Sequence, residues 1–217
     1  MKILALDSSG LVASVAVVEN DTLLAEYTVN YKKTHSQTLL PMLDEISNMT
    51  ELDLSTIDAI AVAGGPGSFT GLRIGSATAK GLGLALEKPL ISIPTTAAIA
   101  YNIWDTNKFV CPIMDARRNQ VYTGVYCYTD HRLDTVWEQD TMSIEALAEG
   151  LNCLDHEVIF LGDGVAVYRK KLQELLTIPF SFAPAHVNRQ RAAAVAALAE
   201  VYYKEGKIQT AEEHEPE

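Results

Sequence analysis

Cysteine is scarce in this chain, which holds only Cys111, Cys127 and Cys153 and has no C-x-x-C spacing. An odd number of widely spaced cysteines argues against a disulfide framework and against a cysteine-based zinc site. The five histidines are scattered as well, with no pair at the spacing that places two imidazoles on one helix face. We therefore expect free thiols, a reducing compartment and no metal site.

Long apolar runs are also missing. No stretch approaches the roughly 18 apolar residues that cross a bilayer, and residues 1–7 lack the apolar core of a signal peptide. We expect a cytoplasmic protein with no membrane partner.

Positive charge is in deficit, since the formal net charge is -11, and the acidic residues 212–217 predict a solvated tail. An acidic surface repels polyanions, so we do not expect nucleic-acid binding by the chain alone, although a local basic patch is compatible with this balance.

The most informative stretch that is present runs over residues 64–75, GGPGSFTGLRIG. Residues 59–63 before it predict a short buried strand, and residues 70 to about 86 after it predict a helix. The glycine turn between them lacks the Gly-Lys-Ser/Thr of a P-loop, so we do not expect independent ATP hydrolysis.

Small residues recur at every fourth position of this predicted helix: Gly71, Gly75, Ala79 and Gly83. An interior helical glycine costs about 1 kcal/mol relative to alanine, so we expect something to pack closely against this stripe. We assign the apolar residues to the helix's own sheet and the small residues to a partner. The apolar set is Leu72, Ile74, Leu82, Leu84 and Leu86.

One pattern occurs twice along the chain. Residues 3–6, Asp7, and residues 12–18 and 23–30 predict a three-stranded meander, and residues 111–114, Asp115, and residues 121–128 and 133–138 predict another. Each copy continues with a helix, a buried strand, a glycine turn and a second helix. This order predicts an α/β protein of two tandem lobes, 1–107 and 108–217, each a mixed sheet with packed helices. A final helix is predicted over about residues 189–205, and the sequence leaves open on which lobe it packs.

Duplicated lobes with an aspartate after the first strand resemble the actin-like ATPase (ASKHA) architecture. A sharper resemblance is carried by residues 1–9, by HSQTLLP at 35–41, by the stretch 64–75, by DARR-x-QVY at 115–122 and by Gly-Asp-Gly at 162–164. Together these motifs resemble the bacterial TsaB family of tRNA threonylcarbamoyladenosine (t6A) biosynthesis proteins, also called YeaZ, which is paralogous to TsaD. The resemblance covers nearly the whole chain.

The resemblance implies a non-catalytic scaffold or activator subunit. Such proteins pair with the homologous catalytic subunit TsaD and with the small ATPase TsaE, and the assembly transfers a threonylcarbamoyl group to N6 of the adenosine 3′ of the anticodon. It further implies a homodimer when the chain is alone, tRNA contact through the complex, and no cofactor of its own, since ATP is used by TsaE. No catalytic residue is expected here, because the segment that carries a His-x-x-x-His pair in TsaD is PTTAAI at 94–99.

The family resemblance and the small-residue stripe together predict a helical interface with a homologous lobe, formed by the helix over 70–86 and by the helix beginning near His35. We expect replacement of Gly75 by leucine to damage partner binding and leave the fold largely intact. The predicted interface residues are His35, Thr38, Leu39, Gly71, Ile74, Gly75, Thr78, Ala79 and Leu82.

A second group of residues predicts contact with an anion or nucleotide: Asp7, Ser68, Arg73, Arg117 and Arg118. Each also has a structural alternative. Asp7 can accept hydrogen bonds from the turn behind it, Ser68 can cap a helix, and Asp163 between two glycines can be a turn or cap residue. Arg117 and Arg118 are either a solvated pair or a contact to TsaD, TsaE or a tRNA phosphate.

A rival function belongs to a different class. The chain would be a stand-alone peptidase-like or kinase-like enzyme of the actin-like fold, using Asp7 and Asp115 in a cleft between the lobes.

Overall fold

The structure is a computed structural model that describes residues 1–31 and 37–215. The chain forms two compact units, the first made of Met1–Ala98 with Gln190–Glu217 and the second of Ile99–Arg189. This division differs from the predicted lobes 1–107 and 108–217 at both ends of the second unit. His35, in the predicted interface, lies outside the described residues.

The first unit is built on a mixed sheet. Its described strands are β1 (Lys2–Asp7), β2 (Val12–Glu19), β3 (Thr22–Asn30), β4 (Ala59–Gly65) and β5 (Leu90–Pro94), in the order β3-β2-β1-β4-β5. The first three strands are the predicted antiparallel meander, and β4 and β5 run parallel to β1. Strands β1, β2 and β4 are almost wholly buried, because helices cover both faces of the sheet.

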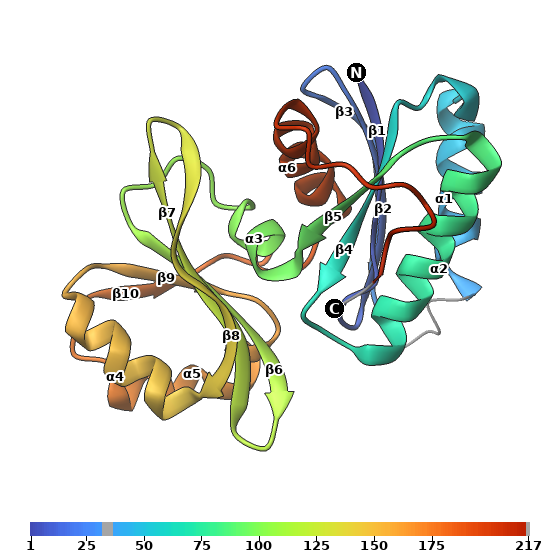
Figure 1. The fold of residues 1–217 in the computed structure, drawn as a ribbon. Coiled ribbons are helices and arrows are strands. Elements are labelled where there is room, and N and C mark those ends of the chain that lie inside the picture. The colour runs from blue at the N-terminus through green and yellow to red at the C-terminus, as the bar shows by residue number, and fades with distance from the viewer. Residues whose placement is uncertain (32–36, 216–217) are drawn as a thin grey trace. The chain divides into compact units, whose positions relative to one another are not determined.

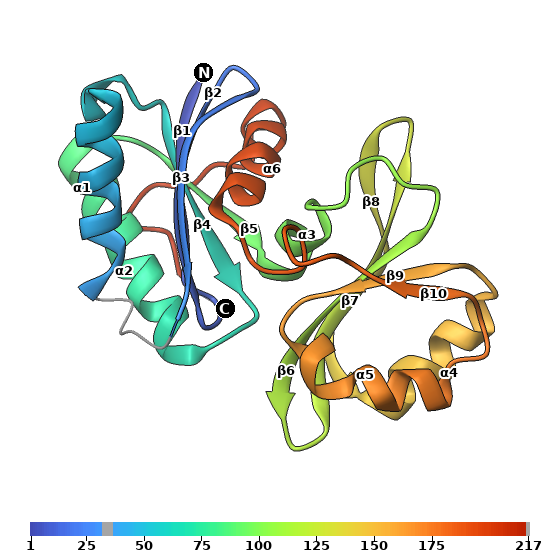
Figure 2. The ribbon, with the colours of Figure 1, turned by 180° about the vertical axis from the view of Figure 1, so that it is seen from behind.

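Two helices, α1 (Leu39–Thr50) and α2 (Phe69–Leu86), lie side by side on one face of this sheet (Figures 1 and 2). Their apolar sides meet in one core cluster with β1, β2 and β4. A short 3-10 helix, η2 (Leu54–Thr56), precedes β4, and α3 (Thr95–Ala100) follows β5. Within the described ranges, no helix is long and apolar enough to cross a membrane.

The last helix, α6 (Ala192–Lys204), covers the opposite face of the first sheet and contacts β1 and β2 (Figure 1). Its first N–H, at Ala192, donates to Ser14 Oγ of β2 at 2.9 Å. The predicted boundaries had placed this helix in the second lobe, although its side of attachment was open from sequence. Ser14, whose contact with Ala192 attaches the helix to the first sheet, lies 178 residues earlier in the chain.

The second unit repeats the topology of the first. Its described strands are β6 (Phe109–Arg117), β7 (Gln120–Thr129), β8 (Arg132–Ser143), β9 (Val158–Leu161) and β10 (Phe180–Phe182), in the order β10-β9-β6-β7-β8. Helices α4 (Ile144–Leu154) and α5 (Gly164–Leu175) pack together on one face, where they share a core with β6, β7 and β9. The predicted duplication into two mixed sheets with packed helices is confirmed.

Candidate functional site

The glycine-rich turn at the start of α2 packs tightly on the turn that follows β1. Ser68 caps α2, since its Oγ accepts a hydrogen bond from Gly71 N at 3.3 Å, and its own N–H donates to Ser9 O at 2.7 Å. A Cβ on Gly67 would lie 2.3 Å from Ser9 O. The turn therefore needs glycine there for a contact inside the unit, and the capping alternative for Ser68 is confirmed.

The small-residue stripe of α2 faces its own unit. A Cβ would lie 2.0 Å from Ser8 O at Gly71 and 2.5 Å from Ser8 Oγ at Gly75, while Ala79 is fully buried. The prediction that this stripe faces away from the sheet is wrong, because the helix lies close enough to the Ser8 turn to exclude side chains. Leucine at Gly75 would therefore disturb the fold before it could report on a partner.

The outward face of α2 lies on neighbouring positions. Arg73, Ala77, Gly81 and Ala85, again spaced by four, are all exposed. A Cβ built on Gly81 meets no described atom within 4 Å outside the adjoining backbone of α2, so no contact among the described residues requires glycine at this position. This second stripe was not predicted, although the same four-residue step that marks the first stripe in the sequence marks it as well.

Large apolar side chains accompany this outward face. Phe69 is 67% exposed and Leu84 is 56% exposed. The Arg73 guanidinium lies over the Phe69 ring, 3.8 Å from its centroid, which covers part of the aromatic face. On the neighbouring helix, Leu40 is 53% exposed. The face thus combines small residues with uncovered apolar groups.

The described residues of the predicted interface do not share one surface. Leu39 is buried in the core, and Thr38 is half-buried at the start of α1. Ile74 and Leu82 pack partly against the core cluster that includes α1, and Thr78 Oγ1 donates to Ile74 O at 2.8 Å. Ile74 and Leu82 thus pack inward beside α1, whereas the Thr78 hydroxyl bonds within α2 itself.

Asp7 is fully buried at the end of β1. Its Oδ1 accepts hydrogen bonds from Ser9 N at 2.9 Å and from Ser9 Oγ at 2.7 Å. The neighbouring Ser8 Oγ donates to Gly71 O at 2.8 Å, which ties the same turn to α2. The structural alternative for Asp7 is confirmed, and in this conformation its carboxylate has no exposed surface for an anion.

The corresponding aspartate of the second unit, Asp115, lies in a chain of hydrogen bonds. Asp163 Oδ1 accepts from Asp115 N at 3.1 Å, and Asp115 Oδ1 accepts from Arg117 N at 3.0 Å and from the Tyr168 hydroxyl at 3.2 Å. Burial raises the pKa of the Asp163 carboxyl, and burial beside Asp115 raises the pKa of the Tyr168 hydroxyl. Asp163 stands at the start of α5, but its side chain does not cap that helix. Its Oδ1 instead accepts the hydrogen bond from Asp115 N near the end of β6.

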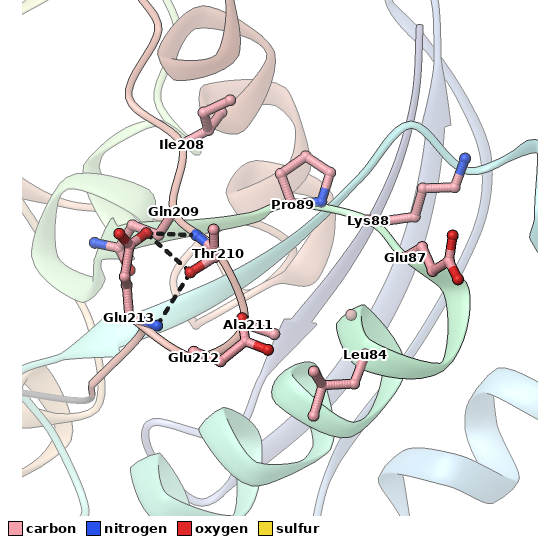
Figure 3. Close-up of a pocket in the computed structure, with 11 residues that line it drawn as sticks. Leu84, Glu87, Lys88, Pro89, Ile208, Gln209, Thr210, Ala211, Glu212 and Glu213 are labelled. Atoms are coloured by element: carbon pink, nitrogen blue, oxygen red, sulfur yellow. Dashed lines mark hydrogen bonds between the residues drawn. The ribbon is translucent and has the colours of Figure 1, made fainter.

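In the C-terminal segment, the solvated tail predicted over residues 212–217 is exposed at Glu212, Glu213 and Glu215 but not at His214, which is buried, and residues 216–217 lie outside the described residues. Gln209 pairs with Leu90 of β5, and Lys80 Nζ of α2 donates to His214 O at 2.9 Å. A groove of about 420 Å³ lies between this segment and the end of α2 (Figure 3). Its lining combines the apolar side chains of Leu84, Pro89 and Ile208 with the acidic side chains of Glu87 and Glu212.

Metal-ligand residues do not cluster in the described part of the chain, where no three His, Cys, Asp or Glu side chains are grouped closely enough to hold an ion. Cys111 is buried, which raises the pKa of its thiol to about 12 and leaves it in the unreactive protonated form.

Comparison with known proteins relates both units to one family. The family model described as TsaD: tRNA N6-adenosine threonylcarbamoyltransferase matches residues 22–217. The tRNA threonylcarbamoyladenosine biosynthesis protein TsaB of Bacillus subtilis is 34% identical over 176 residues, which cover 81% of this chain and 77% of the relative. The solved structure of YeaZ from Pseudomonas aeruginosa is 26% identical with a TM-score of 0.85 and covers 100% of this chain and 98% of its own.

A more distant structure shows the fold alone. The inorganic polyphosphate/ATP-glucomannokinase from Arthrobacter sp. strain KM has a TM-score of 0.55 at 16% identity and covers 94% of this chain and 99% of its own. The predicted actin-like α/β fold is confirmed. The family model, the Bacillus relative and the YeaZ structure agree, and the chain belongs to the TsaB family of tRNA threonylcarbamoyladenosine biosynthesis proteins, also called YeaZ.

Proposed function

We propose that this chain is a non-catalytic subunit of a t6A synthase. In this role it binds a TsaD-type enzyme as a scaffold and activator, works with a TsaE-type ATPase, and supports threonylcarbamoyl transfer to the adenosine 3′ of the anticodon. The names of its relatives, tRNA threonylcarbamoyladenosine biosynthesis proteins TsaB, support the pathway. The subunit role rests on the geometry of the two aspartates and of α2.

The aspartates favour a subunit over a stand-alone enzyme. An enzyme of the rival class would need Asp7 and Asp115 free to act on a substrate. Asp7 is instead buried and accepts two hydrogen bonds from Ser9, and Asp115 Oδ1 orders the β6–β7 turn through Arg117 N. The buried Asp7 therefore has a structural use, and Asp115, although exposed, uses its Oδ1 to hold a turn.

The proposed partner surface is inferred from Gly81, which lies on the outward face of α2. This glycine costs α2 about 1 kcal/mol relative to alanine. Apart from the adjoining backbone of α2 itself, no atom of the described residues lies within 4 Å of the Cβ it lacks. Small residues on an exposed helix face allow a second helix to approach to the close end of the usual range of about 8–10 Å. We propose that the TsaD-type partner packs its homologous helices against Ala77, Gly81 and Ala85, and that the homodimer uses an overlapping surface.

The Gly81→Leu variant tests this surface. We expect its mass by light scattering, mixed with the TsaD of the same organism, to show less heterodimer than the wild type. Overpacking a close contact costs about 1–3 kcal/mol, which weakens association by about 5- to 150-fold. The free energy of unfolding should stay equal or rise by up to about 1 kcal/mol, because leucine favours a helix more than glycine does.

Ala166→Leu is the matched control, since it adds similar bulk at an exposed position of α5 in the second unit. We expect it to associate like the wild type. Undiminished association of Gly81→Leu would contradict the assignment of α2. A wild-type chain that never associates with TsaD would contradict the subunit function itself, and ATP turnover by the purified chain would then support the rival enzyme.

A further inference from the structure

The turn between β6 and β7 has an unusual residue choice. Arg117, Arg118 and Asn119 have φ of 65°, 50° and 62°, all in the left-handed region. Among the described residues, the other two hairpin turns with paired left-handed residues begin with Asn20 and Asp130. Asn and Asp tolerate this conformation because their short side chains bond locally, whereas arginine gains no such compensation.

Arginine is thus kept at two positions where the backbone disfavours it, which is typical of a site whose side chains serve a function. Both side chains are exposed. Neither guanidinium forms an ion pair with any residue that the structure describes, in contrast to Arg191 with Glu26 and Lys171 with Glu145. Two adjacent unpaired cations also stand out in a chain of net charge -11.

The turn is held in this conformation from behind. Asp115 Oδ1 accepts from Arg117 N, and Asp115 N in turn donates to Asp163 Oδ1. The Tyr168 hydroxyl, in a buried side chain of α5, donates to the same Asp115 oxygen. These contacts fix the backbone before any partner arrives, so less ordering entropy is lost when the arginines bind.

The turn projects from the end of the second unit's sheet, yellow-green in Figures 1 and 2. A convex tip suits an extended partner that passes over it. Arginine binds phosphate in a bidentate manner, and adjacent guanidinium groups can engage neighbouring phosphates of one backbone. We propose that Arg117 and Arg118 contact backbone phosphates of the tRNA that the assembled complex modifies. This inference rests on the proposed function and adds a direct RNA contact to it.

The test compares the wild type with the Arg117→Gln/Arg118→Gln variant, each mixed with TsaD, for binding of an unmodified tRNA transcript over a series of salt concentrations. We expect about tenfold weaker binding and a plot of log K against log salt that is shallower by about 1.5, because each lost phosphate contact removes about 0.7 to 0.9 from the slope. Arg117→Lys/Arg118→Lys keeps both charges and should keep most of the slope.

Lys88→Gln/Lys204→Gln is the control, because it removes the same charge from the first unit and should leave the slope nearly unchanged. The mass of each complex is measured in the same samples. A double arginine variant that assembles and binds tRNA as the wild type does would overturn the inference. So would one that loses TsaD, since the arginines would then serve a protein partner. A wild-type chain that fails to assemble contradicts the proposed function instead.

Discussion

At the residue scale, a single carboxylate anchors the last helix. Glu26 of β3 accepts hydrogen bonds from Arg191 Nε and from Ala193 N, each at 3.1 Å, and only 10% of its side chain is exposed. It therefore meets both a guanidinium and the positive N-terminal end of α6. These contacts join positions 165 and 167 residues apart. They explain why local sequence patterns left the attachment of this helix open.

We expect Glu26→Gln to destabilise the protein by about 1–3 kcal/mol, because the amide keeps the shape but replaces charge-assisted hydrogen bonds by weaker ones. The measurement is the midpoint of urea unfolding. Glu149→Gln, on the exposed face of α4, is the control and should change the free energy of unfolding by no more than about 0.5 kcal/mol. Equal midpoints for the two variants would show that Glu26 does not anchor α6.

At the element scale, the span of α2 could be predicted from the sequence, but the orientation of its faces could not. Its predicted span, 70 to about 86, is almost the observed Phe69–Leu86, because capping residues and the absence of proline are local signals. Its orientation could not be read in the same way. Leu84 is 56% exposed while Gly71 and Gly75 are buried, since a close approach to the Ser8 turn selects small residues over leucine. How closely α2 approaches that turn depends on the tertiary packing of the unit, which local sequence patterns do not contain.

The C-terminal segment offers a second test at this scale. His214 is fully buried against α2, and this burial, with the positive charge of Lys80, lowers the pKa of its imidazole below the ordinary 6.5. The unfolded segment then binds a proton more readily than the packed one. The packing of the segment should keep its full stability above about pH 6.5 and lose up to about 1.4 kcal/mol per pH unit as the pH falls below it.

Hydrogen exchange of residues 208–215, corrected for intrinsic rates, measures this loss between about pH 7.5 and about pH 5.5. We expect lower protection at the acid end in the wild type and a much smaller change in His214→Leu, which has no titrating group. His131→Gln changes an exposed histidine of the second unit and should behave as the wild type. Protection that is constant with pH in the wild type would contradict the buried neutral imidazole.

At the scale of the whole molecule, the duplication was predictable and the division between units was not. The repeated meander, helix, strand and glycine turn are local patterns, and both appear as mixed sheets of corresponding strand order. Chain order alone suggested that residues after 107 stay together. The first unit instead takes back Gln190–Glu217, because its sheet has a second apolar face that α6 covers.

This division predicts how fragments behave. Residues 101–189 contain the second sheet with α4, α5 and their core, so we expect this fragment to fold and to unfold cooperatively by circular dichroism. Residues 1–107 lack α6 and leave one sheet face bare, so we expect this fragment to aggregate.

Joining 1–100 to 190–217 by a short Gly-Ser linker should restore a soluble fold, since Asn102 Nδ2 lies 2.8 Å from Arg189 O and the two connections therefore run side by side. A well-folded 1–107 fragment would mean that α6 is dispensable for the first unit, and that the predicted lobe boundary describes the folding units better than the observed packing does.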